Sequence, residues 1–307
     1  MAVVGTGRWG LNIVRDLVTI GSRVIAVDPD EDARRAAADL GAAQVLSSLD
    51  LVDLVDGFVV ATPASTHAQI VDQVAQHSDV PIACEKPLTV SADEAALLAH
   101  RLVDRLTVLH VWRYHPGVEL MAEMARTGRL GEVDAVRTTR ANWTSPRTDI
   151  DPVWTLLPHD LSIAVEFFDA VPSLVCANVE YLDRRAVGAM AMFQDRTSRA
   201  RLIAEVSTRF TDRRREIRVH GSEGVATMDA DDPAGVVRVA FGRDSTPHLE
   251  EIAYERTPAL ERQLGVFCRY LTGGPAPKTT GSEGAAVVEA VEHVLTRARD
   301  EAAPDES

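Results

Sequence analysis

A glycine-rich turn between a short apolar run and an amphipathic stretch is the feature that most constrains how this chain can fold. Gly5-Thr-Gly7-Arg-Trp-Gly10 directly follows the strand-like run Ala2–Val4 and opens a stretch with apolar residues at helical spacing. Glycines let the backbone turn tightly and approach a pyrophosphate, whose charge is stabilised at a helix N-terminus. Asp28 ends the second expected strand, where a carboxylate can accept hydrogen bonds from an adenosine ribose. This order of strand, loop, helix, strand and acid predicts a Rossmann-type dinucleotide site.

The acid at the second strand also bears on the choice of dinucleotide. Asp28 is followed by Pro29 and Asp30, and these carboxylates would repel the 2′-phosphate of NADP. NAD is therefore the expected cofactor, and NADP is the less favoured one. Arginines nearby could reverse the preference, namely Arg8, Arg34 or Arg35.

The first 115 residues alternate short apolar runs with amphipathic stretches of about a dozen residues, which is typical of βαβ units. Strands are expected at residues 2–4, 23–27, 44–46, 57–61, 80–84 and 106–110. Ser91-Ala-Asp-Glu94 is a capping box that opens a further helix. Residues 1–115 are therefore expected to form a Rossmann domain with a parallel sheet.

The second half, residues 116–307, has the texture of an α+β domain. A helix is expected from Pro116 to Thr127, a strand at Val133–Trp143, and a helix beginning near Pro158. From residue 171 to about 254 short strands alternate with turn residues, which predicts an antiparallel sheet. Two helices, at residues 258–271 and 282–299, are expected to close the fold.

Charge and composition exclude several functional classes. The chain has 32 basic and 46 acidic residues, a formal net charge of −14, which repels nucleic acids and anionic lipid surfaces. No stretch is long and apolar enough to cross a bilayer, and the N-terminus lacks a basic leader, so a cytoplasmic protein is expected. The cysteines, Cys84, Cys176 and Cys268, lie far apart, and neither a disulfide framework nor a metal site is indicated.

Two further segments stand at the expected carboxyl ends of strands, where open α/β sheets bind their ligands. These are Ala61-Thr-Pro-Ala-Ser-Thr-His67 and Glu85-Lys86-Pro87. Lys86 stands out, because it and Lys278 are the only lysines among the 32 basic residues. A lysine in such an arginine-rich chain can do what arginine cannot, namely lose its proton or present a compact point charge.

Together these motifs resemble those of the glucose–fructose oxidoreductase and inositol dehydrogenase family. The resemblance covers essentially the whole chain, and the segments between His110 and Asp160 resemble the branch that acts on sugars and nucleotide-linked sugars. It implies a Rossmann domain followed by an α+β domain with an open, mostly antiparallel sheet. The segments that carry it, besides the glycine turn, are Ala61–His67, Glu85–Pro87, His110-Val-Trp-Arg-Tyr-His-Pro116, Gly128-Arg-Leu-Gly131, Arg140-Ala-Asn142 and Val153-Trp-Thr-Leu-Leu-Pro-His-Asp160.

The resemblance also implies roles for individual residues. Lys86 matches the lysine that contacts the nicotinamide and the reacting hydroxyl, and His159 matches the general acid/base, whose imidazole titrates near neutral pH. His159 is expected at the opening of a helix, whose positive end favours the neutral ring. The expected cofactor contacts are Gly5, Gly7, Arg8, Trp9, Gly10, Asp28, Thr62, Pro63, His67, Glu85 and Lys86. The expected substrate contacts, besides Lys86 and His159, are Arg113, Tyr114, Trp143 and Trp154.

One position departs from the family pattern. Many members carry Asp four residues before the histidine, whereas this chain has Thr155, which cannot hold a negative charge. Asp149, Asp151 or Asp160 could supply the missing carboxylate, and His110 is a further candidate supporting residue. Alternatively, the reaction runs as a reduction in which protonated Lys86 or His159 is the acid, or catalysis has been lost.

The expected activity is an NAD(H)-dependent hydride transfer to or from a hydroxyl or keto carbon of a sugar, nucleotide-sugar or cyclitol. The alternatives are a ketone or imine reductase of a biosynthetic pathway and a non-catalytic, dinucleotide-sensing protein of the same fold. The expected partner is a small sugar-like molecule, without nucleic acid or membrane. One face of the second sheet needs cover, which predicts a homo-oligomer, a dimer or tetramer.

Overall fold

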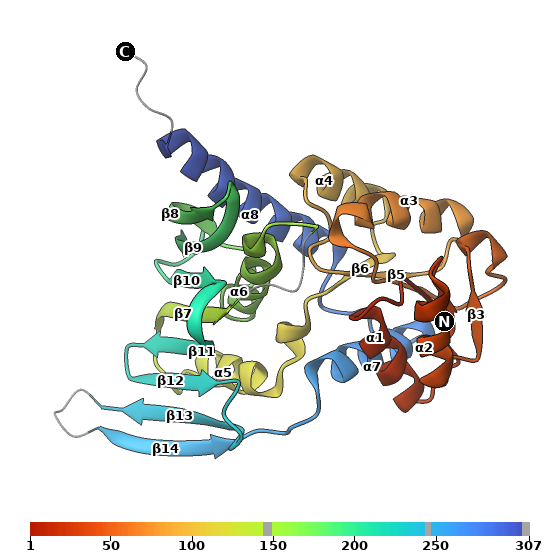
Figure 1. The fold of residues 1–307 in the computed structure, drawn as a ribbon. Coiled ribbons are helices and arrows are strands. Elements are labelled where there is room, and N and C mark those ends of the chain that lie inside the picture. Colours follow the sequence, from red (N-terminus) through yellow and green to blue (C-terminus); the bar gives the residue numbers. More distant parts are fainter. Residues whose placement is uncertain (144–148, 243–246, 303–307) are drawn as a thin grey trace, which may run out of the picture. The chain divides into compact units, whose positions relative to one another are not determined.

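The chain folds into two compact units. The computed structural model describes residues 1–143, 149–242 and 247–302, with side chains as far as residue 298 (Figure 1). The first unit comprises residues 1–111 and 258–288, and the second comprises residues 112–257 and the residues from 289 onward. The expected boundary after residue 115 lies close to the first crossing of the chain. The return of residues 258–288 to the first unit differs from the expected division, in which the second half stayed together.

The first unit contains a parallel sheet of six strands in the order β3-β2-β1-β4-β5-β6. The order reverses between β1 and β4, and ligands bind at such a reversal in open α/β sheets. The strands are β1 (Ala2–Val4), β2 (Ile25–Val27), β3 (Gln44–Leu46), β4 (Phe58–Val60), β5 (Ile82–Glu85) and β6 (Leu106–Leu109). The helices are α1 (Gly10–Thr19), α2 (Glu31–Asp39), α3 (His67–His77), α4 (Ala92–Arg101) and α7 (Ala259–Leu271), with short 3₁₀ turns at Leu49–Leu51 and Ala64–Thr66.

Local chemistry sets the starts of several helices in this unit. Asp30 caps α2 by accepting a hydrogen bond from the backbone N–H of Ala33. Ser91 caps α4 in the same way, from the N–H of Glu94, as the capping box predicted. The strands are short and almost wholly buried, since helices lie on both faces of a parallel sheet.

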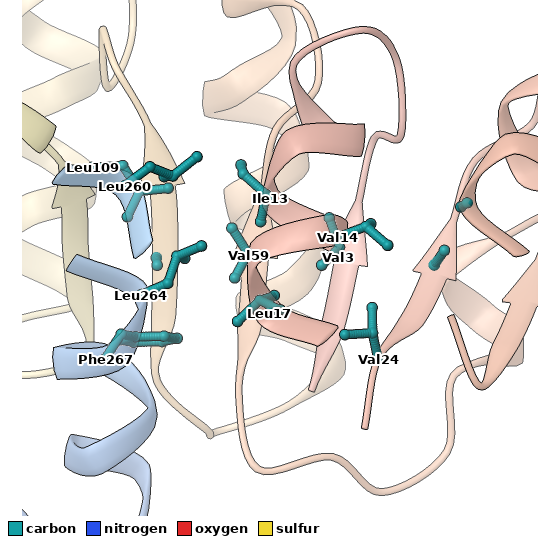
Figure 2. Packing of buried hydrophobic residues seen from close by; sticks show 13 residues of the cluster. Val3, Ile13, Val14, Leu17, Val24, Val59, Leu109, Leu260, Leu264 and Phe267 are labelled. Atoms are coloured by element: carbon teal, nitrogen blue, oxygen red, sulfur yellow. The ribbon is translucent and has the colours of Figure 1, made fainter. Parts of the chain in front are cut away.

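The late helix α7 completes the core of the first unit. Leu260, Leu264 and Phe267 recur at a spacing of three to four residues, so they share one helical face. These side chains are buried in one cluster with Ile13 and Leu17 of α1 and with residues of the central strands (Figure 2). Residues that are more than 240 positions apart therefore form one hydrophobic core.

The second unit is built on a sheet of eight strands in the order β14-β13-β12-β11-β7-β10-β9-β8. All neighbouring pairs are antiparallel except β7 with β10, which confirms the mostly antiparallel sheet. The strands are β7 (Val133–Trp143), β8 (Ser173–Leu182), β9 (Arg185–Gln194), β10 (Arg201–Ser207), β11 (Arg209–Gly221), β12 (Gly224–Asp229), β13 (Val236–Phe241) and β14 (His248–Ala253). The helices are α5 (Pro116–Arg126) and α6 (Pro152–Phe168), preceded by a 3₁₀ turn at Val111–Tyr114 that begins in the first unit. Helix α8 (Gly281–Ala302) starts in the first unit and ends in the second.

Helices α5 and α6 pack on one face of this sheet (Figure 1). Inward side chains such as Val136, Leu202 and Ala204 alternate with exposed or half-buried ones, as expected for a sheet that is covered on one side. Several apolar side chains of β8, β9 and β14 are exposed, among them Met190 and Leu249.

The start of α6 corrects one prediction. The helix begins at Pro152, six residues before the expected start, and Pro158 lies inside it. Proline at the first helical position loses nothing, because that N–H has no partner within the helix, whereas Pro158 costs α6 one backbone hydrogen bond. His159 therefore lies beyond the first turn, where the dipole of the helix no longer favours a neutral imidazole. Part of the expected loop before α6, residues 144–148, lies outside the described residues.

Candidate functional site

The glycine turn after β1 combines two tightly packed glycines with an open one. Gly5 has a φ of +90°, and a Cβ there would lie 2.7 Å from the backbone nitrogen of Thr62. A Cβ at Gly10 would overlap the carbonyl oxygen of Gly5. Gly7 is exposed, and a Cβ built on it would meet no atom within 4 Å. The outer glycines thus shape the loop, and the middle one leaves backbone accessible, as binding of a pyrophosphate requires.

The carboxylate of Asp28 is fixed at the end of β2 by backbone donors. Its Oδ2 accepts from the N–H of Thr6 at 2.7 Å, and its Oδ1 accepts from the N–H of Asp30 at 2.9 Å. The bond from Thr6 joins the acid to the glycine loop. The guanidinium of Arg34 donates to the carbonyl oxygens of Asp28 and Pro29, both at 2.8 Å. These residues fit a dinucleotide with its pyrophosphate at the loop and its ribose at Asp28.

The segments that follow β1, β4 and β5 are joined by hydrogen bonds in which side chains take part. The indole N–H of Trp9 donates to Oε1 of Glu85 at 2.5 Å, which ties the glycine loop to the segment that carries Lys86. Lys86 is the residue after β5 and is only 9% exposed. Since β1 and β5 belong to one parallel sheet, Lys86 and the glycine loop lie at the same edge.

His67 fastens the loop after β4 to the loop after β5. Its Nδ1 lies 2.7 Å from the carbonyl oxygen of Pro87, and its Nε2 lies 2.9 Å from that of Thr62. The ring is fully buried. Carbonyl oxygens only accept, so both contacts are hydrogen bonds when both ring nitrogens carry a proton. The structure therefore places His67 behind the binding loops, where it positions them.

The other expected cofactor residues of the first unit lie at the surface of these loops. Arg8 and Pro63 are exposed. Thr62 is half-buried, and its hydroxyl accepts a hydrogen bond from the hydroxyl of Thr66 at 3.0 Å. Asp28, Arg8, Thr62 and the glycine loop thus lie at the carboxyl ends of the parallel strands, where the strand order reverses between β1 and β4.

In the second unit, His159 lies on α6 beside an aromatic ring. The His159 side chain is partly exposed, and its ring centroid is 6.4 Å from that of Trp112, in an edge-to-face arrangement. The carbonyl oxygen of His159 accepts from the hydroxyl of Ser162 at 2.8 Å. Trp112 also stacks on His115, with ring centroids 5.1 Å apart. The imidazole of His159 is therefore oriented by packing as well as by its helix.

A buried ion pair also contacts Trp112. The guanidinium carbon of Arg140 is 4.3 Å from the centroid of the Trp112 ring, and its Nη2 is 3.2 Å from Oδ1 of Asp160. The exposed fractions of the two charged side chains are 6% and 1%. Burial raises the pKa of the Asp160 carboxyl, and the nearby Arg140 offsets part of that rise. Neither Trp112 nor Arg140 was assigned a role from sequence, although both lie in segments that carry the family resemblance.

Two of the three carboxylates that could substitute for the Asp missing at position 155 already bind other groups. Asp160 is held by Arg140, and Asp151 accepts from Arg185 and from the backbone N–H of Ala186. Asp149 lies in the bend before α6. The hydroxyl of Thr155 donates to the carbonyl oxygen of Pro152 at 2.7 Å. Asp160 and Asp151 therefore already neutralise arginines.

The remaining candidate residues differ in burial. Arg113 pairs with Glu166 at 2.7 Å, and both side chains are nearly buried. His110, Tyr114 and Trp154 are buried, whereas Trp143, at the end of β7, is 68% exposed. Figure 1 shows β7 as a central strand of the second sheet, and α6 packs against this sheet.

The described residues contain neither a cluster of metal ligands nor a membrane-spanning helix. Within residues 1–143, 149–242 and 247–302, no group of three or more His, Cys, Asp or Glu side chains is arranged to hold a metal ion. None of the helices in that part of the chain has both the length and the apolar character needed to span a bilayer.

Comparison with known proteins identifies relatives of both units. Residues 1–112 match the family described as "Oxidoreductase family, NAD-binding Rossmann fold". UDP-N-acetylglucosamine 3-dehydrogenase of Acidithiobacillus ferrooxidans is 30% identical over 197 residues, which cover 62% of this chain and 58% of that protein. Inositol 2-dehydrogenase of Rhizobium meliloti is 25% identical over 292 residues, 87% of this chain and 86% of that protein. An uncharacterised oxidoreductase of Streptococcus pneumoniae is 31% identical over a match that spans only 40% of its length.

Solved structures share the fold over almost the whole chain. The UDP-N-acetylglucosamine 3-dehydrogenase of Acidithiobacillus ferrooxidans superposes with a TM-score of 0.81 at 22% identity and covers 96% of each chain. Levoglucosan dehydrogenase, in complex with NADH and levoglucosan, superposes with a TM-score of 0.86 at 16% identity over 98% of this chain and 97% of that one. With the glycine turn, the Glu-Lys-Pro segment and the second sheet in place, residues 1–112 match this NAD-binding oxidoreductase family, and the chain as a whole is similar to inositol 2-dehydrogenase and shares the fold of these dehydrogenases.

Proposed function

We propose that this protein is an NAD(H)-dependent dehydrogenase that acts on a hydroxyl or keto carbon of a sugar-like substrate. The hydrogen bond from Trp9 to Glu85 carries the proposal, because it joins the glycine loop to the segment of the rare lysine, Lys86. A dinucleotide held at Gly7 would extend along the edge of the sheet where Lys86 lies. The named relatives act on nucleotide-linked sugars and inositol, which supports a substrate of this class.

The nicotinamide ring, when bound, supplies the acceptor or donor of hydride. This chain's residues then have to handle a proton and a developing charge. An ammonium group at Lys86 donates a hydrogen bond to the substrate oxygen and stabilises it as the hydroxyl ionises. His159 takes the proton as general base, since imidazole titrates near neutral pH. In the reverse direction the protonated imidazole returns it.

In this chain, which has Thr155 in place of Asp, contacts with neighbouring side chains orient the imidazole of His159. The hydroxyl of Thr155 donates to the helix backbone, Trp112 packs against the imidazole, and Arg140 of the Arg140–Asp160 pair lies over the Trp112 ring. We therefore propose that packing against Trp112, which Arg140 contacts in turn, orients the imidazole for proton transfer.

NAD is the proposed cofactor because Asp28 presents a carboxylate at the ribose position and is held there by Thr6 and Asp30. Arg34 is engaged by the carbonyl oxygens of Asp28 and Pro29, so its guanidinium is already partly satisfied. A 2′-phosphate would have to compete for it next to a fixed carboxylate.

Turnover by single variants tests the proposal. The wild-type protein, given NAD and a panel of sugars and cyclitols, should produce absorbance at 340 nm. Lys86→Ala and His159→Ala should each lower kcat by ~10²-fold or more while NADH still binds. Ser65→Ala, at an exposed residue of the loop after β4, is the matched control. Wild-type kcat in either catalytic variant would remove the role assigned to that residue.

We further propose that the protein is a homo-oligomer, through the sheet face that α5 and α6 leave uncovered. Met190 of β9 and Leu182 of β8 expose large apolar side chains on this part of the unit. Sedimentation should find a dimer or tetramer at micromolar concentration, and Met190→Glu should shift it toward monomer. A monomeric wild-type protein would contradict this proposal.

A further inference from the structure

Three consecutive arginines in β11 have different surroundings. In the sequence, Arg213-Arg-Arg215 has the character of a solvated charge run. Arg213 pairs with Asp231 at 3.0 Å, and Arg214 pairs with Asp212 at 3.0 Å, and both arginines are exposed. Arg215 is half-buried, and none of the carboxylates in the described part of the chain forms an ion pair with it. Arg215 is therefore less exposed to solvent than the other two arginines.

The register of the sheet places Arg215 on the face that the helices cover. Arg215 lies opposite Arg140 in the pairing of β11 with β7. Ile217 and Val219, which follow at alternate positions of β11, are fully buried on that face. Arg214 directly precedes Arg215 in the strand and therefore belongs to the opposite face. Two arginines thus lie side by side under the helices of the second unit.

The charges of these two arginines are not equally balanced. Asp160 neutralises Arg140, whereas no carboxylate among the described residues forms an ion pair with Arg215. Burial lowers the pKa of Arg215 to about 10, with further contributions from Arg213 and Arg140, and Asp231 opposes them only in part. A half-buried cation in a positive environment is unfavourable for the folded protein on its own. An anion placed against it would be strongly stabilised, although the whole chain carries a net charge of −14.

This cation belongs to the surroundings of His159. Arg140, its neighbour on β7, stacks on Trp112, and Trp112 packs edge-to-face against the imidazole of His159. All four residues belong to the second unit. A chain of neighbouring residues thus leads from the uncompensated charge of Arg215, through Arg140 and Trp112, to the proposed base, His159.

We propose that Arg215 binds an anionic group of the substrate, a carboxylate or a phosphate, so that the enzyme prefers acidic or phosphorylated sugars over neutral ones. A guanidinium suits this role, because its planar fork matches two oxygens of either group. That the ligand is a sugar rests on the proposed dehydrogenase function. It assigns the substrate selectivity to a residue outside the motifs that carry the family resemblance.

Kinetics with matched sugars test the proposal. The wild-type enzyme and the variants Arg215→Gln, Arg215→Lys and Arg214→Gln are assayed with NAD on glucose, glucuronate and glucose 6-phosphate. We expect kcat/KM on the preferred anionic sugar to fall about 10²-fold in Arg215→Gln, mainly through KM, with partial rescue in Arg215→Lys. Activity on glucose should change less than threefold, and Arg214→Gln should match wild type. The better anionic substrate distinguishes a carboxylate from a phosphate as the ligand group.

Equal kcat/KM values of Arg215→Gln and Arg214→Gln on both anionic sugars would overturn the proposal, as would a wild-type preference for glucose. Thermal melting separates binding from folding. Without ligand, Arg215→Gln should melt at or above the wild-type temperature, because it removes an uncompensated charge, and a marked decrease would show a structural role instead. If no sugar is oxidised, the dehydrogenase function fails, and calorimetric titration with glucuronate and glucose 6-phosphate still tests Arg215. Binding that is lost in Arg215→Gln alone supports the anion site, and equal binding in all variants refutes it.

Discussion

Gly7→Ala should separate binding of the dinucleotide from folding of the protein. A methyl group at this position meets no protein atom within 4 Å, and Gly7 does not have a left-handed φ. Replacement of glycine by alanine in a compatible conformation stabilises a protein by about 0.4–1 kcal/mol, because it restricts the unfolded chain. The methyl group would instead occupy the space in which the pyrophosphate approaches the backbone. The variant should therefore be at least as stable as wild type and bind NADH poorly.

The size of the binding loss follows from the contacts that the methyl group prevents. Hydrogen bonds from backbone N–H groups to a charged phosphate are worth about 1.5–3 kcal/mol each. Losing two of them costs about 3–6 kcal/mol, which raises the Kd for NADH by roughly 10²-fold or more. The opposite signs of the two effects make the prediction specific, since a general defect in folding would lower both quantities.

Calorimetric titration with NADH and thermal melting of the free protein measure the two quantities. Gly265→Ala is the matched control, because Gly265 lies on α7 and its nearest neighbour would be 3.5 Å from the added Cβ. Gly10→Ala is the contrasting variant, which should lower stability because its Cβ would overlap the carbonyl oxygen of Gly5. A Gly7→Ala protein that binds NADH within threefold of wild type would refute the assignment of the loop to the pyrophosphate.

Further variants test the acid, the buried ion pair and the thiols. Asp28→Ala should raise the Kd for NADH tenfold or more and reduce discrimination against NADPH, and unchanged titrations with both would remove its role. Asp160→Asn should lower the free energy of unfolding by about 3–5 kcal/mol in urea titrations, because it leaves Arg140 buried and uncompensated, whereas wild-type stability would mean that the pair contributes little. Burial raises the pKa of the Cys84 thiol, so iodoacetamide at pH 8 should alkylate exposed Cys176 and leave Cys84 unmodified until the protein unfolds, as peptide mass spectrometry would detect.

Local patterns in the sequence predicted the strands and the capped helices well. The expected bounds of the strands at residues 2–4, 44–46 and 133–143 agree with the structure, since their apolar content and their flanking turn residues leave few alternatives. Ser91 caps its helix as predicted. The glycine turn and Asp28 lie where the Rossmann pattern placed them, because that pattern is set by close backbone contacts within about 30 residues of chain.

Features that depend on distant contacts were not predictable in this way. Pro158 resembles the first residue of a helix, but Asp151 and Pro152 begin α6 and Pro158 is accommodated inside it. His67 has the sequence context of a cofactor contact, and only the fold shows that it bridges two carbonyl oxygens. Arg215 belongs to a charged run, and only the strand register shows which of three arginines faces the helices. Each of these outcomes is decided by a partner that lies on another element.

The return of α7 to the first unit has a consequence for how the protein is made. A nascent chain that ends after residue 111 lacks Leu260, Leu264 and Phe267, whose burial is worth about 1.5–3 kcal/mol each, against a total of about 5–15 kcal/mol for a typical domain. The nucleotide-binding half therefore reaches its full stability only after the ribosome has completed the other half. Chimaeras that exchange substrate specificity between relatives should accordingly transplant residues 112–257 as an insert and keep residues 258–288 with their own N-terminal half.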